Sequence, residues 1–301
     1  MMKHFSNRNR FAGAALCVLM TGGLCGVLVE VRATWLRLTS DFRSHASLPT
    51  VPSTSSIRSA RTVAIASADG ARLTAWWLPG PRHHPIVLLH GSGAARDQLI
   101  PEAEVLSEFG YSVLLLDLPG HGGSSGEIVW GRSERLAVGA AVSFVSDQAP
   151  GASVGLLGFS LGAMIAAQVA STDSRVRAVV LAGIPASFDA QMKREHSNWG
   201  WLSSYPAIWS ARIAGYRDDG PEPIKAVTKV GALLVIVGTS DTTVPCGDSL
   251  GVFGAAHHPK ELLRVEGGHH GDYAQVLGRE SYGRAITRFF ERHLENGNRG
   301  L

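Results

Sequence analysis

Cysteine and charge are both scarce in this chain. Only 3 of its 301 residues are Cys, which excludes a disulfide scaffold and a zinc site with several cysteine ligands. Charged residues make up 18% of the sequence, whereas an average soluble domain has about 25%. The net charge is only +3 and no Lys/Arg-rich run occurs, so the sequence predicts no nucleic-acid-binding surface.

An internal repeat and a collagen-like glycine period are also absent. Hydrophobic residues make up 45% of the chain, which excludes disorder for most of its length. Glycine is abundant instead, with 35 residues. Many of these glycines lie in short loops after apolar runs, where an α/β protein needs tight turns.

The N-terminus carries an uncharged run, Phe11–Val29, behind the basic residues Lys3, Arg8 and Arg10. A helix needs about 20 apolar residues to cross the roughly 30 Å hydrocarbon core of a bilayer. We therefore expect residues 1–32 to form a hydrophobic helix that acts as a signal anchor, with the rest of the chain outside the cytoplasm. A cleaved signal peptide, which would leave a secreted or periplasmic protein, and a buried soluble helix are the alternatives.

Residues 33–60 are rich in Ser and contain Pro, which is typical of a linker. From residue 61 the pattern changes to that of one folded domain, 61–301. Two short strand-like runs, 61–67 and 72–78, flank Asp69-Gly70, which is a hairpin signal.

Continuous apolar runs then alternate with segments of helical spacing. The runs span 86–89, 113–116, 154–157, 176–181, 233–237 and 262–265, and the helical segments span 99–109, 136–145, 160–170 and 282–294. Runs that are apolar on both faces are typical of buried parallel strands. We expect an α/β fold with a mostly parallel central sheet and helices on both faces, whose chemistry lies at the carboxyl ends of the strands.

The loop after the third run reads Gly158-Phe159-Ser160-Leu161-Gly162. This is a G-x-S-x-G motif between a strand and a helix, where the glycines leave room for a sharp turn that exposes the serine hydroxyl. The dipole of the following helix would stabilise a developing oxyanion. Ser160 is therefore the candidate nucleophile.

A serine nucleophile needs a base, and the base needs a carboxylate to orient it. Asp241 follows the fifth apolar run and is the candidate acid, with Asp248 and Asp189 as weaker rivals. His269 and His270 follow the sixth run. We choose His270 as the base and keep His269 as the alternative, because the direction of each side chain in a loop is invisible in the sequence.

Taken together, these residues resemble the α/β-hydrolase fold family of serine hydrolases over about residues 61–295. Four motifs agree in order: His90-Gly91-Ser92-Gly93, Asp117-Leu118-Pro119-Gly120-His121-Gly122-Gly123-Ser124, the Ser160 turn, and the Asp241 and His270 loops. The ending Gly267-Gly268-His269-His270-Gly271-Asp272 is similar to that of anchored members with a small lid, which favours His270. The resemblance also implies an oxyanion hole from the backbone N–H groups of Ser92 and Leu161, and a structural role for His121.

The resemblance implies a Ser-Asp-His acyl-enzyme mechanism on a small-molecule carboxylic ester, without metal or organic cofactor. A short lid is expected at about 183–230, and it carries Trp199, Trp201, Tyr205 and Trp209. These aromatics make apolar acyl or lipid esters attractive substrates. A serine peptidase or amidase with the same triad is one alternative, and a non-catalytic binding protein of the same fold is another.

Overall fold

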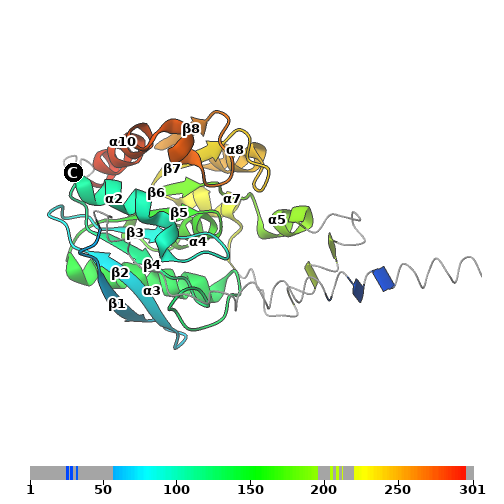
Figure 1. Ribbon diagram of the computed structural model, residues 1–301, viewed down its shortest axis with the longest axis horizontal. Coiled ribbons are helices and arrows are strands. Elements are labelled where there is room, and N and C mark those ends of the chain that lie inside the picture. Colours follow the sequence, from blue (N-terminus) through cyan, green and yellow to red (C-terminus); the bar gives the residue numbers. More distant parts are fainter. Residues whose placement is uncertain are drawn as a thin grey trace, which may run out of the picture. The chain divides into compact units, whose positions relative to one another are not determined.

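The computed structural model describes residues 25, 26, 28, 29, 32, 57–195, 204, 205, 208, 209, 212 and 220–295. The chain divides into two compact units. One unit combines Met1–Asp41 with Met192–Gly215, and the other combines Phe42–Gln191 with Tyr216–Leu301. The second unit holds the sheet, the helices around it and every candidate site residue (Figure 1).

A single sheet of eight strands, in the order β1-β2-β4-β3-β5-β6-β7-β8, forms the centre of the second unit. β1 pairs antiparallel with β2 and β2 with β4, whereas all other neighbours are parallel. The predicted mostly parallel sheet is therefore confirmed. The strands are β1 (Arg61–Ala66), β2 (Arg72–Leu78), β3 (Ile86–Leu89), β4 (Val113–Leu116), β5 (Val154–Phe159), β6 (Val176–Ala182), β7 (Ala232–Gly238) and β8 (Lys260–Val265).

Helices form two groups around this sheet. In one group α2 contacts α10, and α10 contacts α9; in the other α3 contacts α4, α4 contacts α7, and α7 contacts α8. The helices are α2 (Ile100–Glu108), α3 (Arg132–Gln148), α4 (Leu161–Ala170), α5 (Phe188–Glu195), α7 (Pro223–Ala226), α8 (Cys246–Ala255), α9 (Tyr273–Leu277) and α10 (Arg279–Phe290). Short turns of helix are η1 (Arg96–Leu99), η2 (Val227–Lys229) and η3 (Glu291–Glu295).

The central strands are apolar at every position because both of their faces are covered. All residues of β3, β4 and β5 are buried. Phe289 and Phe290 of α10 belong to the core cluster on one face, and Gly155 of β5 leaves space for Phe290, since a Cβ there would lie 2.8 Å from the Phe290 ring. On α4 every residue is buried, which explains its run of small side chains.

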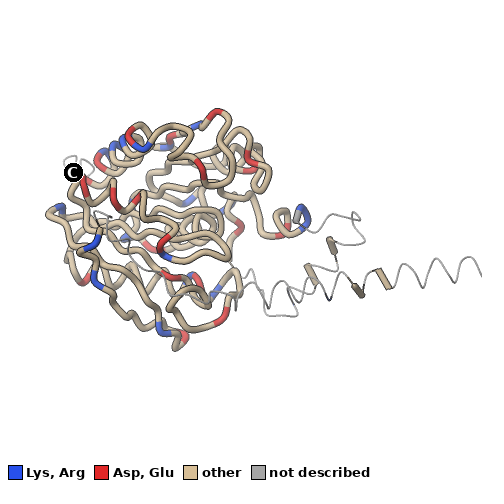
Figure 2. The backbone as a smooth tube through the Cα atoms, viewed as in Figure 1, with Lys and Arg blue, Asp and Glu red and all other residues tan. Residues whose placement is uncertain are grey.

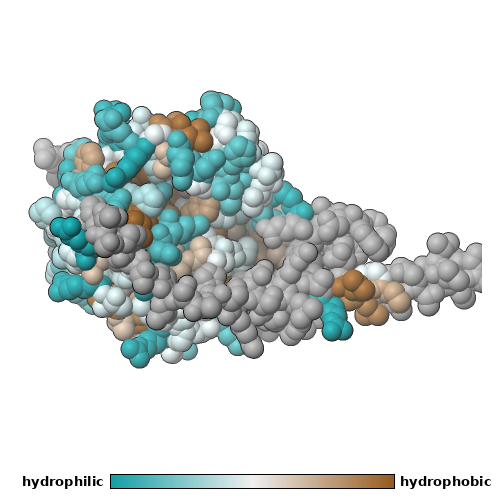
Figure 3. All heavy atoms as spheres, viewed as in Figure 1, coloured by the Kyte–Doolittle hydropathy of each residue, from teal (hydrophilic) through white to brown (hydrophobic). Residues whose placement is uncertain are grey.

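Charged residues lie mostly on the outer helices and loops, with both signs interspersed, while the strands at the centre of the sheet carry few (Figure 2). On the face seen in Figure 3, apolar residues of the second unit form separate small patches among hydrophilic ones. The low charge content of the sequence therefore reflects the large share of the chain that is buried in the sheet.

Most of the predicted N-terminal helix (1–32) and linker (33–60) lies outside the described residues. Among the residues that the structure does describe, no helix is both long and apolar enough to cross a bilayer. The expected lid, 183–230, contains α5, α7 and η2. Tyr205 and Trp209 are exposed, by 53% and 68%, whereas Trp199 and Trp201 are not among the described residues.

A buried ion pair ties the loop after β4 to the turn of helix after β3. Asp117 is fully buried and Arg96 is 5% exposed, and the Arg96 guanidinium forms an ion pair with Asp117 Oδ2. The backbone N–H of Arg96 also donates to Asp117 Oδ1 (2.7 Å), and that of Gly123 donates to Oδ2 (2.7 Å). Burial raises the pKa of Asp117, while these N–H groups and Arg96 act in the opposite direction.

Asp117→Ala is expected to lower the free energy of unfolding by about 3–5 kcal/mol, because it leaves the buried Arg96 without its counter-charge. Urea denaturation measures this change. The matched control is Asp173→Ala, whose partner Arg175 is 41% exposed and whose loss should cost less than about 1 kcal/mol. Equal losses in the two variants would contradict the role assigned to the buried pair.

Candidate active site

Ser160 lies at the turn between β5 and α4. Its backbone has φ 53° and ψ −112°, and Ser160 and Trp130 are the non-glycine residues with positive φ in the described part of the chain. A residue other than glycine adopts this backbone conformation only when the surrounding structure enforces it. The Ser160 N–H donates to Ala182 O (2.9 Å), and its carbonyl accepts the N–H groups of Ala163 and Met164.

Two glycines make this turn possible. A Cβ on Gly158 would lie 2.3 Å from Gly162 O, and a Cβ on Gly162 would lie 2.1 Å from Leu89 O at the end of β3. Both distances are shorter than any real contact between these atoms, so only glycine fits. The strand, the turn and the first residues of α4 are therefore packed as the G-x-S-x-G motif predicts.

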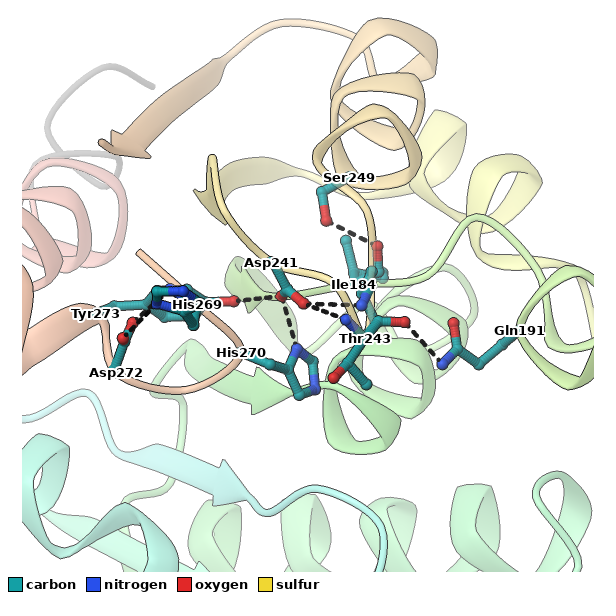
Figure 4. A network of polar contacts seen from close by, with 10 residues as sticks. Ile184, Gln191, Asp241, Thr243, Ser249, His269, His270, Asp272 and Tyr273 are labelled. Carbon is teal, nitrogen blue, oxygen red and sulfur yellow. Dashed lines mark hydrogen bonds and ion pairs between the residues drawn. The ribbon is translucent and has the colours of Figure 1, made fainter. Parts of the chain in front are cut away.

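Asp241 and His270 lie together at the carboxyl edge of the sheet (Figure 4). His270 Nδ1 is 2.7 Å from Asp241 Oδ2, and the Asp241 side chain is 1% exposed. Asp241 Oδ1 accepts the N–H groups of Thr243 (2.9 Å) and Val244 (2.8 Å). Burial alone would raise the pKa of Asp241, but the hydrogen bonds from His270 and from these N–H groups hold it below its usual value.

His269 occupies a different environment. Its side chain is 66% exposed and its Nδ1 lies 3.2 Å from Asp272 Oδ2, a contact drawn in Figure 4. Within the described part of the chain, no group of three His, Cys, Asp or Glu side chains is arranged to hold a metal ion.

The two rival acids lie on helices rather than in the loop after β7. Asp248 lies in the first turn of α8, where its Oδ2 is 3.5 Å from the N–H of Ala186. Asp189 lies in the first turn of α5. Asp241 is thus the carboxylate that the fold places against His270.

The Ser160 turn and the His270 loop meet at the end of β6. Ala182 accepts the Ser160 N–H, and a Cβ on the next residue, Gly183, would lie 3.1 Å from His270 Cε1. The rings of Phe159 and His270 are also in contact, with centroids 4.6 Å apart. The structure therefore brings the predicted nucleophile, base and acid to one edge of the sheet.

Ser92 and Leu161 lie on neighbouring segments as well. Ser92 is exposed in the turn after β3, and Leu161 is the first residue of α4. The close approach of Gly162 to Leu89 O and His90 O joins these two segments. Within the described part of the chain, neither the Ser92 N–H nor the Leu161 N–H donates a backbone hydrogen bond.

Tyr273 is a site residue that the sequence did not reveal. Its hydroxyl donates to Asp241 Oδ2 at 3.3 Å, and its ring is 2% exposed. Gly183 and Gly238 leave room for it, because Cβ atoms there would lie 2.7 Å and 3.0 Å from its atoms. Burial, together with the charge of Asp241, raises the pKa of Tyr273, so the phenol stays a donor. No motif marks this residue.

Comparison with known proteins shows the family of this chain. Residues 84–212 match the family model described as alpha/beta hydrolase fold. An uncharacterised protein of Mycobacterium tuberculosis is 32% identical over 253 residues, which cover 79% of this chain and 82% of that protein. The chain belongs to the α/β-hydrolase fold family.

Solved structures share the fold of this chain at lower identity. An esterase from Pyrococcus furiosus is 23% identical with a TM-score of 0.66, covering 82% of this chain and 100% of that one. An esterase from Exiguobacterium antarcticum is 20% identical with a TM-score of 0.58, covering 76% of this chain and 99% of that one. Both are similar to this chain in fold.

Gly158→Ala is expected to destabilise the protein by about 2–3 kcal/mol, because its methyl group would overlap Gly162 O. Urea denaturation measures the change. The matched control is Gly139→Ala in α3, where nothing lies within 4 Å of the added Cβ and where alanine should stabilise the helix by about 0.5–1 kcal/mol. A Gly158→Ala variant as stable as the control would contradict the tight turn.

Proposed function

We propose that this protein is a serine hydrolase of carboxylic esters that uses Ser160, His270 and Asp241. The observation that carries the proposal is the 2.7 Å contact between His270 and the buried Asp241, beside a serine held at positive φ on a strand-to-helix turn. A base, its orienting carboxylate and a serine nucleophile are the parts that acyl transfer requires.

In the proposed reaction, Ser160 Oγ attacks the ester carbonyl carbon while His270 Nε2 takes the hydroxyl proton. The lowered pKa of Asp241 keeps its carboxylate ionised at neutral pH, so that it stabilises the imidazolium. The N–H groups of Ser92 and Leu161 stabilise the oxyanion. His270 then gives the proton to the leaving alcohol. Water, deprotonated by His270, attacks the acyl-enzyme, and His270 returns that proton to Ser160 Oγ as the acid leaves.

Esters are the proposed class because neighbours of the same fold are named esterases. An amide would need the same machinery, and the test below separates the two. The exposed Tyr205 and Trp209 support an apolar acyl or lipid ester, since aromatic side chains bind apolar chains and membrane interfaces.

We also propose that residues 1–32 attach the protein to a membrane, as a signal anchor, with the catalytic domain outside the cytoplasm. The uncharged run Phe11–Val29 supports this proposal. We expect the mature protein to keep its N-terminus and to fractionate with membranes. Mass spectrometry of the N-terminus tests this, and a mature chain that begins near residue 33 would favour the cleaved signal peptide.

Ser160→Ala and His270→Ala are each expected to lower kcat at least about 10³-fold on p-nitrophenyl esters from acetate to palmitate. His269→Ala is the matched control and should keep near wild-type turnover, because its side chain faces solvent. If His269→Ala were the inactive variant, the base would be His269. The chain-length optimum measures the size of the acyl pocket.

The acid is tested in the same series. Asp241→Asn is expected to lower kcat about 10⁴-fold by favouring the wrong histidine tautomer, whereas Asp248→Asn should have little effect. A wild-type protein that labels with a fluorophosphonate but cleaves matched amides better than esters would favour the peptidase alternative. A wild-type protein that neither turns over nor labels would overturn the proposed function in favour of a binding role.

A further inference from the structure

In the turn after β3, side chains accept hydrogen bonds from the backbone N–H groups of the residues before and after Ser92. The N–H of Gly91 donates to Gln98 Oε1 at 2.8 Å, and that of Gly93 donates to His121 Nε2 at 3.3 Å. In the described part of the chain the Ser92 N–H has no such acceptor. The Gln98 and His121 side chains therefore fix the peptide units before and after the Gly91–Ser92 peptide, whose N–H is left for a ligand.

Gln98 is itself fixed by the buried ion pair. It lies in η1 (Arg96–Leu99), one turn of helix whose first residue, Arg96, bonds Asp117 through both its backbone N–H and its guanidinium. The Gln98 N–H donates to Ala95 O (3.0 Å). Because the start of η1 cannot shift without breaking the pair with Asp117, the backbone that carries the exposed Gln98 side chain is held near Gly91.

His121 reaches the same turn from the loop after β4. Its Nδ1 lies 3.0 Å from Pro119 O, which requires a proton on Nδ1 and leaves Nε2 as an acceptor for the Gly93 N–H. The side chain is 1% exposed, and its ring is 4.8 Å from that of His90. This arrangement fixes both the tautomer and the position of the imidazole.

The turn held in this way lies directly beside the Ser160 turn. A Cβ on Gly91 would lie 3.0 Å from the Phe159 ring, and one on Gly162 would lie 2.7 Å from His90 O. With so little free space, a small rotation of the Gly91–Ser92 peptide would move the Ser92 N–H relative to the oxygen of a bound acyl group. Donors in an oxyanion hole act only when they are fixed before the charge develops.

We propose that Gln98 and His121 are positioning residues that clamp the peptides flanking Ser92 and so aim its N–H at the oxyanion. The inference rests on the proposed function, because it needs an acyl oxygen at the Ser160 site. Gln98 belongs to none of the sequence motifs, so its contact with Gly91 is visible only in the structure. The buried His121 acts in the reaction without contacting the substrate.

Gln98→Met in the full-length protein is the decisive variant, because methionine keeps the length of the side chain and removes the acceptor. We expect kcat on a p-nitrophenyl ester to fall about 10- to 100-fold, less than for complete loss of an oxyanion donor, with KM changed less than about 3-fold. The inhibition constant of a trifluoromethyl ketone, which forms a tetrahedral adduct with serine, should rise in parallel with the loss of kcat/KM.

Gln148→Met is the matched control, because Gln148 is an exposed residue at the end of α3. It should leave kcat, KM and the inhibition constant unchanged, and the Tm of both variants should match the wild type. His121→Phe, which keeps a ring but removes the Nε2 acceptor, should act in the same direction as Gln98→Met. If it does not fold, Gln98→Met decides alone.

The possible outcomes distinguish failure of the clamp from failure of the proposed function. An active wild type whose kcat and inhibition constant are unchanged by Gln98→Met overturns the clamp and leaves the proposed function standing. A fall in kcat of Gln98→Met that comes with an equally large rise in KM, or only with a lowered Tm, also overturns the clamp. A wild type that neither cleaves esters nor labels with a fluorophosphonate overturns the proposed function and the clamp with it.

Discussion

The close approach of α4 to the end of β3 is the constraint on which the site depends. Because Gly162 lies against Leu89 O and Gly158 against Gly162 O, the chain must turn within one residue, and that residue is Ser160 at φ 53°. The same approach places the N-terminus of α4 beside the turn that carries Ser92. The position of Ser160 and that of the Ser92 turn therefore depend on one packing requirement, which glycine meets at two positions.

Around this contact, buried polar groups join the loops after β3 and β4. Asp117 binds Arg96 and the Gly123 N–H, His90 Nε2 accepts the Leu118 N–H (3.0 Å), and His121 reaches Gly93. Buried polar groups are stable only when they are hydrogen-bonded. The two loops therefore behave as one rigid support, and the loop after β7 forms a second support around Asp241 through the N–H groups of Thr243 and Val244.

Most of the sheet could be predicted because its central strands are apolar on both faces, a pattern that buried parallel strands require. The sequence pattern predicts no helix over Cys246–Ala255, because Gly247, Gly251 and Gly254 weaken the helical signal. These glycines have open space around them, and tertiary packing of residues such as Val252 (0% exposed) holds the helix in place. The strands of the first hairpin were predictable from Asp69-Gly70.

The sequence by itself determined the order of the central strands, the tight turn at Ser160 and the set of polar residues at the ends of the strands, because these depend on local pattern. It left two adjacent histidines and several acids as alternatives. Only the tertiary structure placed His270, and not His269, against Asp241, and revealed Tyr273 and Gln98. The physical reason is that the direction of a loop side chain is decided by packing between segments far apart in the chain, such as Gly183 and Gly238 around Tyr273.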